Sequence, residues 1–430
     1  MKAKTTRILI TGAHGQLGQA LLANLPWLPE FSPSRLRMEI PEASLVPGSA
    51  VEPRSAIAPG SAIEIVALGH QQLDLTSAHL PERLSEINAD VIINCAAYNA
   101  VDAAEQDMAA AMALNAEAPE RLAIWCRQQG AWLIHISSDY VFGNVFGNVF
   151  GNDLGSVFGN VSGNAAANIL GNAPRALTES DVCEPLSLYG QSKLAGEQRL
   201  LKANPGALVL RTSWLYSRFG SNFVLTMGRL LTERPELKVV ADQVGTPTWA
   251  EALARLIWQL LIWFHLKPEK SAVLSGCFHY AATGQCSWYL FTKEIAEQIA
   301  KQQCNSASSS QAPPPLQTAS PSQAALHAQA TLHSQATLHA QAALANPAPI
   351  TPRCRITPVS TAEYGAILNR AQAPRPAYSA LDSSALKDAM AAMPSAFRCY
   401  LPKDYPSPIW LSWQAQLALM LSGLGASSLD

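Results

Sequence analysis

Short apolar runs alternate with turns and helical patterns through the first half of the chain. Residues 7–11 form an apolar run suited to a buried parallel strand, and residues 19–25 have the pattern of a helix. Further strand-like runs occupy residues 63–68 and 132–142. This alternation predicts an α/β fold built on a Rossmann-type, doubly wound parallel sheet.

The turn between the first strand and the first helix carries three glycines. Gly12 permits a tight turn, Gly15 lets the backbone approach a pyrophosphate, and Gly18 allows the helix to pack closely on the strand. The start of the helix, at Gln16 and Leu17, offers free N–H groups and a positive dipole to phosphates. Because strand, turn and helix follow in the order that the motif requires, we predict a dinucleotide site at these five residues.

Three further side chains suit proton chemistry at a carbonyl group. Tyr189 and Lys193 are four residues apart, so a helix places them on one face, where the ammonium would lower the tyrosine pKa from its usual ~10. Ser138 lies toward the C-terminal end of a predicted strand, at the sheet edge where ligands collect. Alone, each has an ordinary interpretation: a surface tyrosine beside a solvated lysine, and a serine in a turn. Together with the glycine turn they predict a reductase site.

These motifs resemble the extended branch of the short-chain dehydrogenase/reductase superfamily, and within it the dTDP-4-dehydrorhamnose reductase family. The matching segments are residues 94–105, 137–142, 188–197, 210–216, 220–223, 242–248 and 375–382. The resemblance implies that Ser138, Tyr189 and Lys193 form the catalytic set. It also implies NAD(P)H-dependent reduction of the C4 keto group of dTDP-4-dehydro-6-deoxy-L-mannose to dTDP-L-rhamnose, in nucleotide-sugar biosynthesis for cell-surface polysaccharide.

The resemblance implies further ligand contacts. On the cofactor side they are Asp74 and Leu75 beside the adenine, Ala97, Tyr98 and Asn99 beside the nicotinamide half, and Lys193 on the nicotinamide ribose. On the substrate side they are Ser138, Tyr189, Asp139 and Trp214 at the sugar, Asn222 in the nucleotide-sugar pocket, and Arg375 closing over the diphosphate. Ordinary alternatives stay open at two of these positions: Asp74 as a helix cap, and Trp214 as core packing.

Cofactor preference follows from the end of the second predicted strand. An NAD site usually has an acidic residue there to hold the ribose 2′-hydroxyl, and residues 68–71 contain none. We therefore expect NADPH, with NADH tolerated, although no arginine stands there to bind a 2′-phosphate.

Some relatives dimerise through magnesium held by glutamates. One of those positions falls at Ala20 here and another at Glu251, so a bridging Mg²⁺ is not favoured and no metal ligand is assigned.

Three insertions interrupt the predicted domains. We expect the NADP-binding domain to cover residues 1–210 with a return at 238–264, and a smaller, mixed substrate-binding domain to cover 211–237 and 265–430. The insertions are a Pro/Ser/Ala-rich stretch at 26–61, a Val-Phe-Gly-Asn repeat at 143–172, and a repeat at 305–349 that spaces His327, His333 and His339 six residues apart. Residues six apart do not share a helix face, which favours disorder over a metal site.

Composition agrees with a cytoplasmic enzyme whose partner is a small nucleotide sugar. A 48% hydrophobic content over 430 residues supplies a sizeable core. The formal charge of -2 gives no field to recruit nucleic acid or a membrane, and the apolar stretch 256–264 is too short to span one. The sequence does not decide between a monomer and a homodimer. Two other functions also stay open: a non-catalytic dinucleotide-binding regulatory subunit, and a nucleotide-sugar epimerase or dehydratase.

Overall fold

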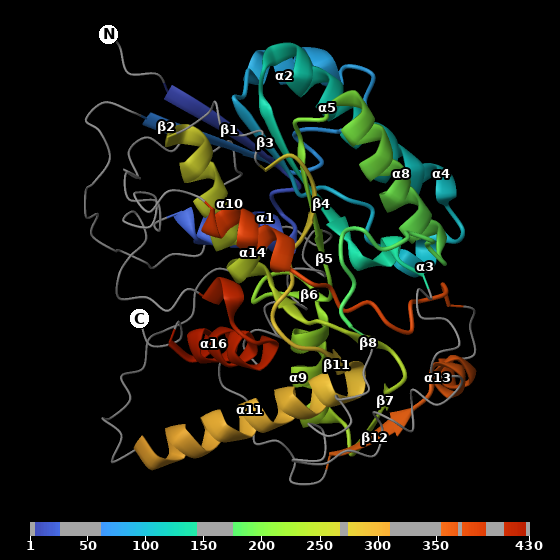
Figure 1. Ribbon diagram of the computed structural model, residues 1–430. Helices are drawn as coiled ribbons and strands as arrows, with labels where there is room; N and C mark the ends of the chain where they lie inside the picture. The colour runs from blue at the N-terminus through green and yellow to red at the C-terminus, as the bar shows by residue number, and fades with distance from the viewer. Residues whose placement is uncertain are drawn as a thin grey trace, which may run out of the picture.

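A parallel sheet of six strands forms the centre of the molecule (Figure 1). The computed structural model describes residues 5–25, 62–143, 175–266, 274–309, 354–368, 372–392 and 408–426. In spatial order the strands are β10 (Gly276–His279), β5 (Leu208–Thr212), β4 (Trp132–Ser138), β3 (Val91–Asn94), β1 (Thr5–Thr11) and β2 (Ala62–Leu68). All of their pairings are parallel, so the predicted Rossmann-type fold is confirmed.

The apolar runs form strands because the sheet is covered on both faces. β3 is buried at every position, and the β1 register sets Ile8 opposite Ile65 and Val91. Chain order reverses between β1 and β3, where the sheet grows outward in both directions. In folds of this kind ligands bind beyond the carboxyl ends of the strands at such a switch point.

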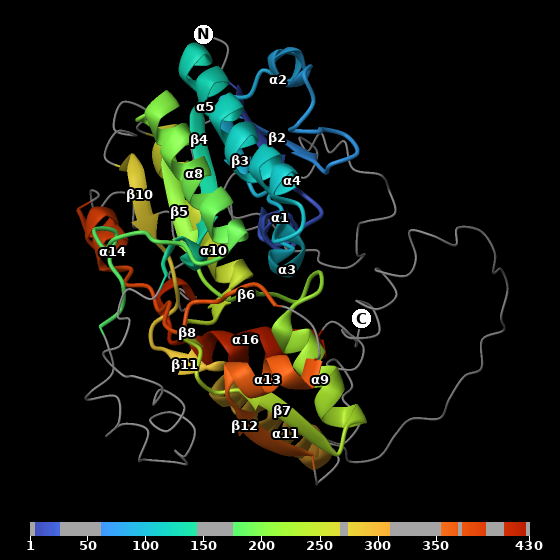
Figure 2. The same cartoon turned by 90° about the vertical axis from the view of Figure 1, so that its right-hand side faces the viewer.

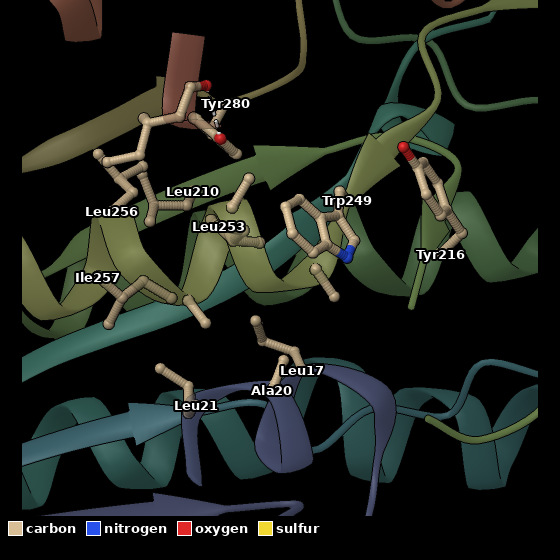
Figure 3. Packing of buried hydrophobic residues seen from close by; sticks show 14 of the residues in the cluster. Leu17, Ala20, Leu21, Leu210, Tyr216, Trp249, Leu253, Leu256, Ile257 and Tyr280 are labelled. Atoms are coloured by element: carbon tan, nitrogen blue, oxygen red, sulfur yellow. Dashed lines mark hydrogen bonds between the residues drawn. The ribbon is translucent and has the colours of Figure 1, made fainter. Parts of the chain in front are cut away.

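Helices lie on both sides of the sheet (Figure 1). One side carries α2 (Leu80–Ile87), α3 (Val101–Ala104), α4 (Met108–Met112), a π-helical turn (Ala113–Glu117), α5 (Ala118–Gln129) and α8 (Leu188–Ala203). The other side carries α1 (Gln16–Ala23) and α10 (Ala250–Leu266). Leu17, Ala20 and Leu21 of α1 face Leu253 and Ile257 of α10 in the core (Figure 3).

Helix α10 contains the apolar stretch 256–264, which forms a buried helix as expected. The Trp258 indole donates a hydrogen bond to the Leu21 carbonyl at 3.0 Å, which fixes α10 against α1. Within the described ranges, none of the helices combines the length and the hydropathy needed to cross a membrane.

A second group of elements lies beyond the carboxyl ends of the sheet strands (Figure 2). Its strands pair in twos: β6 (Leu215–Tyr216) with β9 (Thr248–Trp249), β7 (Glu236–Val240) with β12 (Arg355–Val359), and β8 (Val244–Gly245) with β11 (Cys286–Ser287). Its helices are α9 (Phe223–Glu233), α11 (Trp288–Ser309), α13 (Thr361–Leu368) and α16 (Trp413–Ala426). A 3-10 turn (Pro408–Trp410) precedes α16, and α14 (Ser384–Ala391) contacts β10.

Two strand pairings cross the domain limits that the sequence suggested. β10 lies within the range assigned to the substrate domain, yet it pairs with β5 in the main sheet. β7 reaches into the range assigned to the Rossmann return, yet it pairs with β12. The division into two domains stays a prediction. The insertions at 26–61, 143–172 and 305–349 lie outside the described residues, apart from Gly143 and the end of α11 at 305–309.

Candidate active site

Ser138, Tyr189 and Lys193 come together at the carboxyl end of β4. Ser138 is the last residue of this strand, and its side chain lies within reach of the Tyr189 phenol and affects its pKa. Lys193, one turn further along α8, donates from Nζ to the Ile136 carbonyl at 2.8 Å. Strand and helix therefore bring a hydroxyl, a phenol and an amine to one place.

The start of α8 explains how the helix comes so close to the strand. The Ser187 hydroxyl caps the helix by accepting a hydrogen bond from Gly190 N at 3.1 Å. A Cβ at Gly190 would lie 2.2 Å from the carbonyl oxygen of Tyr140, which no other residue could accommodate without movement. The Tyr140 ring packs edge-on against Tyr189, with centroids 5.3 Å apart. Gly190 thus allows the close approach that sets Tyr189 beside Ser138.

The expected lowering of the Tyr189 pKa by Lys193 is not found. Burial raises the pKa of Tyr189, and the Ser138 side chain opposes this only in part. Burial also lowers the pKa of Lys193 to about 8, while the nearby Glu197 carboxylate favours the charged amine. The cause is common to both side chains, because a buried site disfavours the charged form of either. The amine is directed to a backbone carbonyl instead of the phenol.

Asp139 follows Ser138 directly and is almost wholly buried. One carboxylate oxygen accepts a hydrogen bond from Ser379 at 2.6 Å, and the other accepts from Ser138 at 3.0 Å. Burial raises the pKa of Asp139 to about 6, against the effect of these bonds. Both oxygens have protein partners, so the carboxylate orients the Ser138 hydroxyl and ties it to the C-terminal segment.

Asn115 joins the cofactor side of the site to α8, and the sequence analysis missed it. Its Oδ1 accepts from Tyr98 N at 2.8 Å, and its Nδ2 donates to the Tyr98 carbonyl and to Ser192 Oγ. The residue lies in the π-helical turn and is 1% exposed. An amide inside an otherwise apolar helical run was the available signal, since a buried amide needs several partners. Residues 97–99 are thereby held beside the helix that carries Tyr189.

The glycine turn has the shape that a pyrophosphate requires. Gly12 has φ +62°, and a Cβ there would lie 2.7 Å from Ala96 N. Gly15 is the N-cap of α1, and no side chain caps this helix end. The backbone N–H groups at the start of α1 can therefore bind an anion. Leu17 is buried in the core, so only its backbone can take part (Figure 3).

The adenine side shows two features of interest. Asp74 is exposed, and its carboxylate accepts from Thr76 N at 2.9 Å and Thr76 Oγ1 at 2.7 Å, which lowers its pKa. This bond closes a turn ahead of α2, while Leu75 is buried. At the end of β2, a Cβ on Gly69 would lie 2.5 Å from the His14 ring. His14 is thus an additional polar group beside the expected ribose position.

Two of the predicted substrate residues, Trp214 and Asn222, follow β5, the neighbour of β4. Ser138 pairs in register with Thr212, and Trp214 comes two residues later. Asn222 is the N-cap of α9: its Oδ1 accepts from Leu225 N, and its Nδ2 donates to the Ser217 carbonyl at 2.7 Å. Its polar groups thus have partners within the protein.

Arg375, which is expected beside the diphosphate, has partners within the protein. Its guanidinium lies 2.9 Å from Asp102 of α3 and also donates to the Ala373 carbonyl. This ion pair ties the C-terminal segment to the helix that follows β3.

Glu251, one of the positions associated with magnesium, has an arginine as its partner in this structure. Glu251 is fully buried, and its carboxylate pairs with the Arg218 guanidinium at 3.1 Å. Ala20, at the other position, lies in the core between α1 and α10 (Figure 3). Among the residues that the structure describes, no cluster of three or more His, Cys, Asp or Glu side chains could hold a metal ion.

Comparison with known proteins identifies relatives along most of the chain. The RmlD substrate binding domain family matches residues 54–341. The dTDP-4-dehydrorhamnose reductase of Sinorhizobium fredii is 36% identical over 234 residues, which cover 54% of this chain and 69% of that protein. The enzyme of the same name from Burkholderia thailandensis is 32% identical over 293 residues, covering 67% of this chain and 77% of that protein.

A solved structure matches the whole fold. The dTDP-4-dehydrorhamnose reductase of Bacillus anthracis, crystallised in complex with NADP, is 26% identical with a TM-score of 0.61. The match covers 98% of this chain and 100% of that one.

Proposed function

The chain belongs to the family described by the RmlD substrate binding domain, that of the dTDP-4-dehydrorhamnose reductases, and from this membership we propose its reaction. The proposed reaction is NAD(P)H-dependent reduction of the C4 keto group of dTDP-4-dehydro-6-deoxy-L-mannose to dTDP-L-rhamnose. The observation that carries the proposal is the meeting of Ser138, Tyr189 and Lys193 at the carboxyl end of β4, on the same sheet edge as the glycine turn. A hydroxyl, a phenol and an amine are what carbonyl reduction requires beside a hydride donor.

Each of the three side chains has a proposed role. When bound, NADPH supplies the hydride equivalent for the C4 carbon. Tyr189 donates the proton to the C4 oxygen; its raised pKa keeps the phenol protonated, and therefore able to donate, at neutral pH. Ser138 hydrogen-bonds the same oxygen. Since Ser138 has a single proton, which Asp139 accepts in this structure, it must exchange that partner for the substrate.

Lys193 and the loop before α3 serve the cofactor in this proposal. The amine lies one helical turn from Tyr189 and holds the nicotinamide ribose. Tyr98 is fixed to α8 through Asn115, so the nicotinamide side of the site and the proton donor keep a constant separation. The free N-terminus of α1 binds the pyrophosphate.

We propose NADPH as the preferred cofactor, with NADH accepted. The end of β2 and the loop after it, residues 68–72, carry no carboxylate that would repel a 2′-phosphate. His14 lies against Gly69 at this position and can donate a hydrogen bond to a phosphate oxygen.

A reductase assay tests the proposal. The purified chain should oxidise NADPH in the presence of dTDP-4-dehydro-6-deoxy-L-mannose, with a lower kcat/KM for NADH. Tyr189→Phe should lower kcat by about 10²–10⁴-fold, the usual contribution of a positioned proton donor, while NADPH still binds. Tyr364→Phe on α13 is the matched control and should be normal. Near-normal turnover by Tyr189→Phe would reject the proposed proton donor.

A further inference from the structure

Trp214 has an unusual backbone conformation for a tryptophan. Its φ is +46°, in the left-handed region that residues with a Cβ avoid. Such a conformation persists where the surroundings fix it, and it is often found at functional sites. The residues around Trp214 must therefore hold it in this conformation.

Trp288 covers the indole of Trp214. The two rings are stacked with centroids 3.5 Å apart and an interplanar angle of 5°. Trp288 is itself anchored, because its Nε1 donates to Gln243 Oε1 at 3.2 Å and its ring packs against Phe223 at 4.5 Å. Gln243 in turn donates to Thr361 Oγ1, at the start of α13. Trp288 thus has little freedom to move away.

Gly245 contacts the same indole through its bare backbone. A Cβ at this position would lie 2.5 Å from Trp214 Cε2 and 2.6 Å from Trp214 Nε1. Since real Cβ atoms do not approach so closely, any side chain at 245 would displace the indole. The backbone of Trp214 is held as well, because its carbonyl accepts from Thr248 N at 3.3 Å.

We propose that Trp288 and Gly245 are positioning residues that fix Trp214 for binding of the nucleotide sugar. This rests on the proposed function and on the contact with the sugar that the family resemblance implies for Trp214. Trp214 follows Thr212, the register partner of Ser138, so its orientation is set close to the reacting carbonyl. An indole that is already ordered loses little conformational freedom when the substrate binds, which favours affinity. Trp288 acts through Trp214 and donates nothing to the reaction.

The stacked pair provides a signal that does not depend on activity. Two parallel indoles this close couple their transitions, and a rotation of one ring relative to the other within their planes gives an exciton couplet in circular dichroism. We expect the couplet in the wild type, its loss in Trp214→Phe and Trp288→Phe, and its retention in Trp410→Leu. Trp410 is the matched control, because it is a partly buried tryptophan that packs against Tyr280.

Kinetics separate positioning from general stability. Trp288→Leu should raise KM for the nucleotide sugar by about twofold to tenfold, the range expected for losing one aromatic pair, with a smaller change in kcat. Trp288→Phe should restore most of the affinity, since a phenyl ring still stacks. Gly245→Ala should also raise KM for the nucleotide sugar, because the added Cβ displaces the Trp214 indole.

The outcomes distinguish this proposal from the reductase assignment. A wild-type couplet that Trp288→Phe abolishes, with no NADPH oxidation by the wild type, would reject the reductase and keep the stacked clamp. Normal NADPH oxidation with an unchanged KM in Trp288→Leu would reject the positioning role. Circular dichroism that changes no more in Trp214→Phe and Trp288→Phe than in Trp410→Leu would reject the clamp itself.

Discussion

Lys193 is an amine held in a site that disfavours its charge. It is 2% exposed and donates to the Ile136 carbonyl at 2.8 Å. Burial lowers its pKa to about 8, against the effect of Glu197. The charged form therefore predominates below pH 8 and disappears as the pH rises through that value. Because the proposed role of Lys193 is to hold the cofactor, its charge should appear in the pH dependence of cofactor capture.

We predict that the reduction rate falls at alkaline pH because Lys193 loses its charge, which gives the pH profile an alkaline limb. The kcat/KM for NADPH, which reports the free protein, should fall as the pH rises through about 8, because the neutral amine no longer attracts the anionic cofactor. Steady-state rates between neutral and alkaline pH measure this. Lys193→Arg keeps a permanent cation, so its residual activity should lack the limb. A limb of the same midpoint in that variant would assign it to another group.

Helix α8 carries its functional side chains on one face. Tyr189, Lys193 and Glu197 follow at intervals of four residues, and Glu197 forms a two-point ion pair with Arg211 of β5. Both partners are less than 10% exposed. Arg211 also lies 3.4 Å from the His279 ring of β10 and over the Phe142 ring. This pair fixes the orientation of α8 on the sheet, and with it the position of Tyr189.

Removing Glu197 should strongly destabilise the fold. Glu197→Ala leaves the Arg211 charge buried without its partner, and we expect a loss of about 3–5 kcal/mol in the free energy of unfolding. Urea unfolding at neutral pH measures it. The matched control is Glu233→Ala, which breaks the exposed pair of Arg229 and Glu233 at 2.7 Å and should cost less than about 0.5 kcal/mol. Equal losses in the two variants would contradict a special role for the buried pair.

Elements with a strong local signal were predictable from the sequence, and those defined by distant contacts were not. β1, β2 and β4 appear where apolar runs predict them, because strands buried on both faces need continuous apolar sequence. The pairing of β10 with β5 was not predicted, because four residues at a sheet edge carry no periodic signal.

The site shows the same limit. Spacing predicts that Tyr189 and Lys193 share a helix face, since that depends only on the helix. It does not predict that the amine turns to the Ile136 carbonyl, because the strand that supplies this carbonyl lies 57 positions away in the chain. The link through Asn115 likewise depends on a contact with Ser192, 77 positions away.

At the scale of the whole molecule, both flanks of the Val-Phe-Gly-Asn insertion are anchored. Phe142 and Leu177 are fully buried in one cluster with Tyr378 and Leu381. Leu177 N donates to the Ala380 carbonyl at 2.8 Å, and the Leu177 carbonyl accepts from Asp382 N and from the His279 ring. The ends of the insertion are therefore fixed by described residues, independently of the repeat between them.

Deletion of residues 145–172 should leave the fold and NADPH binding intact. The flanking contacts stay in place, and shortening the connection between them changes the closure free energy by only about 0.6 kcal/mol for each halving of its length. Differential scanning calorimetry should show one cooperative transition, and titration calorimetry an unchanged Kd for NADPH. Phe142→Ala in the full chain is the comparison: it should lose about 3–5 kcal/mol of stability, because it removes a buried ring from the anchoring cluster. A deletion variant that melts without cooperativity, beside a stable Phe142→Ala variant, would mean that the repeat itself is part of the folded core.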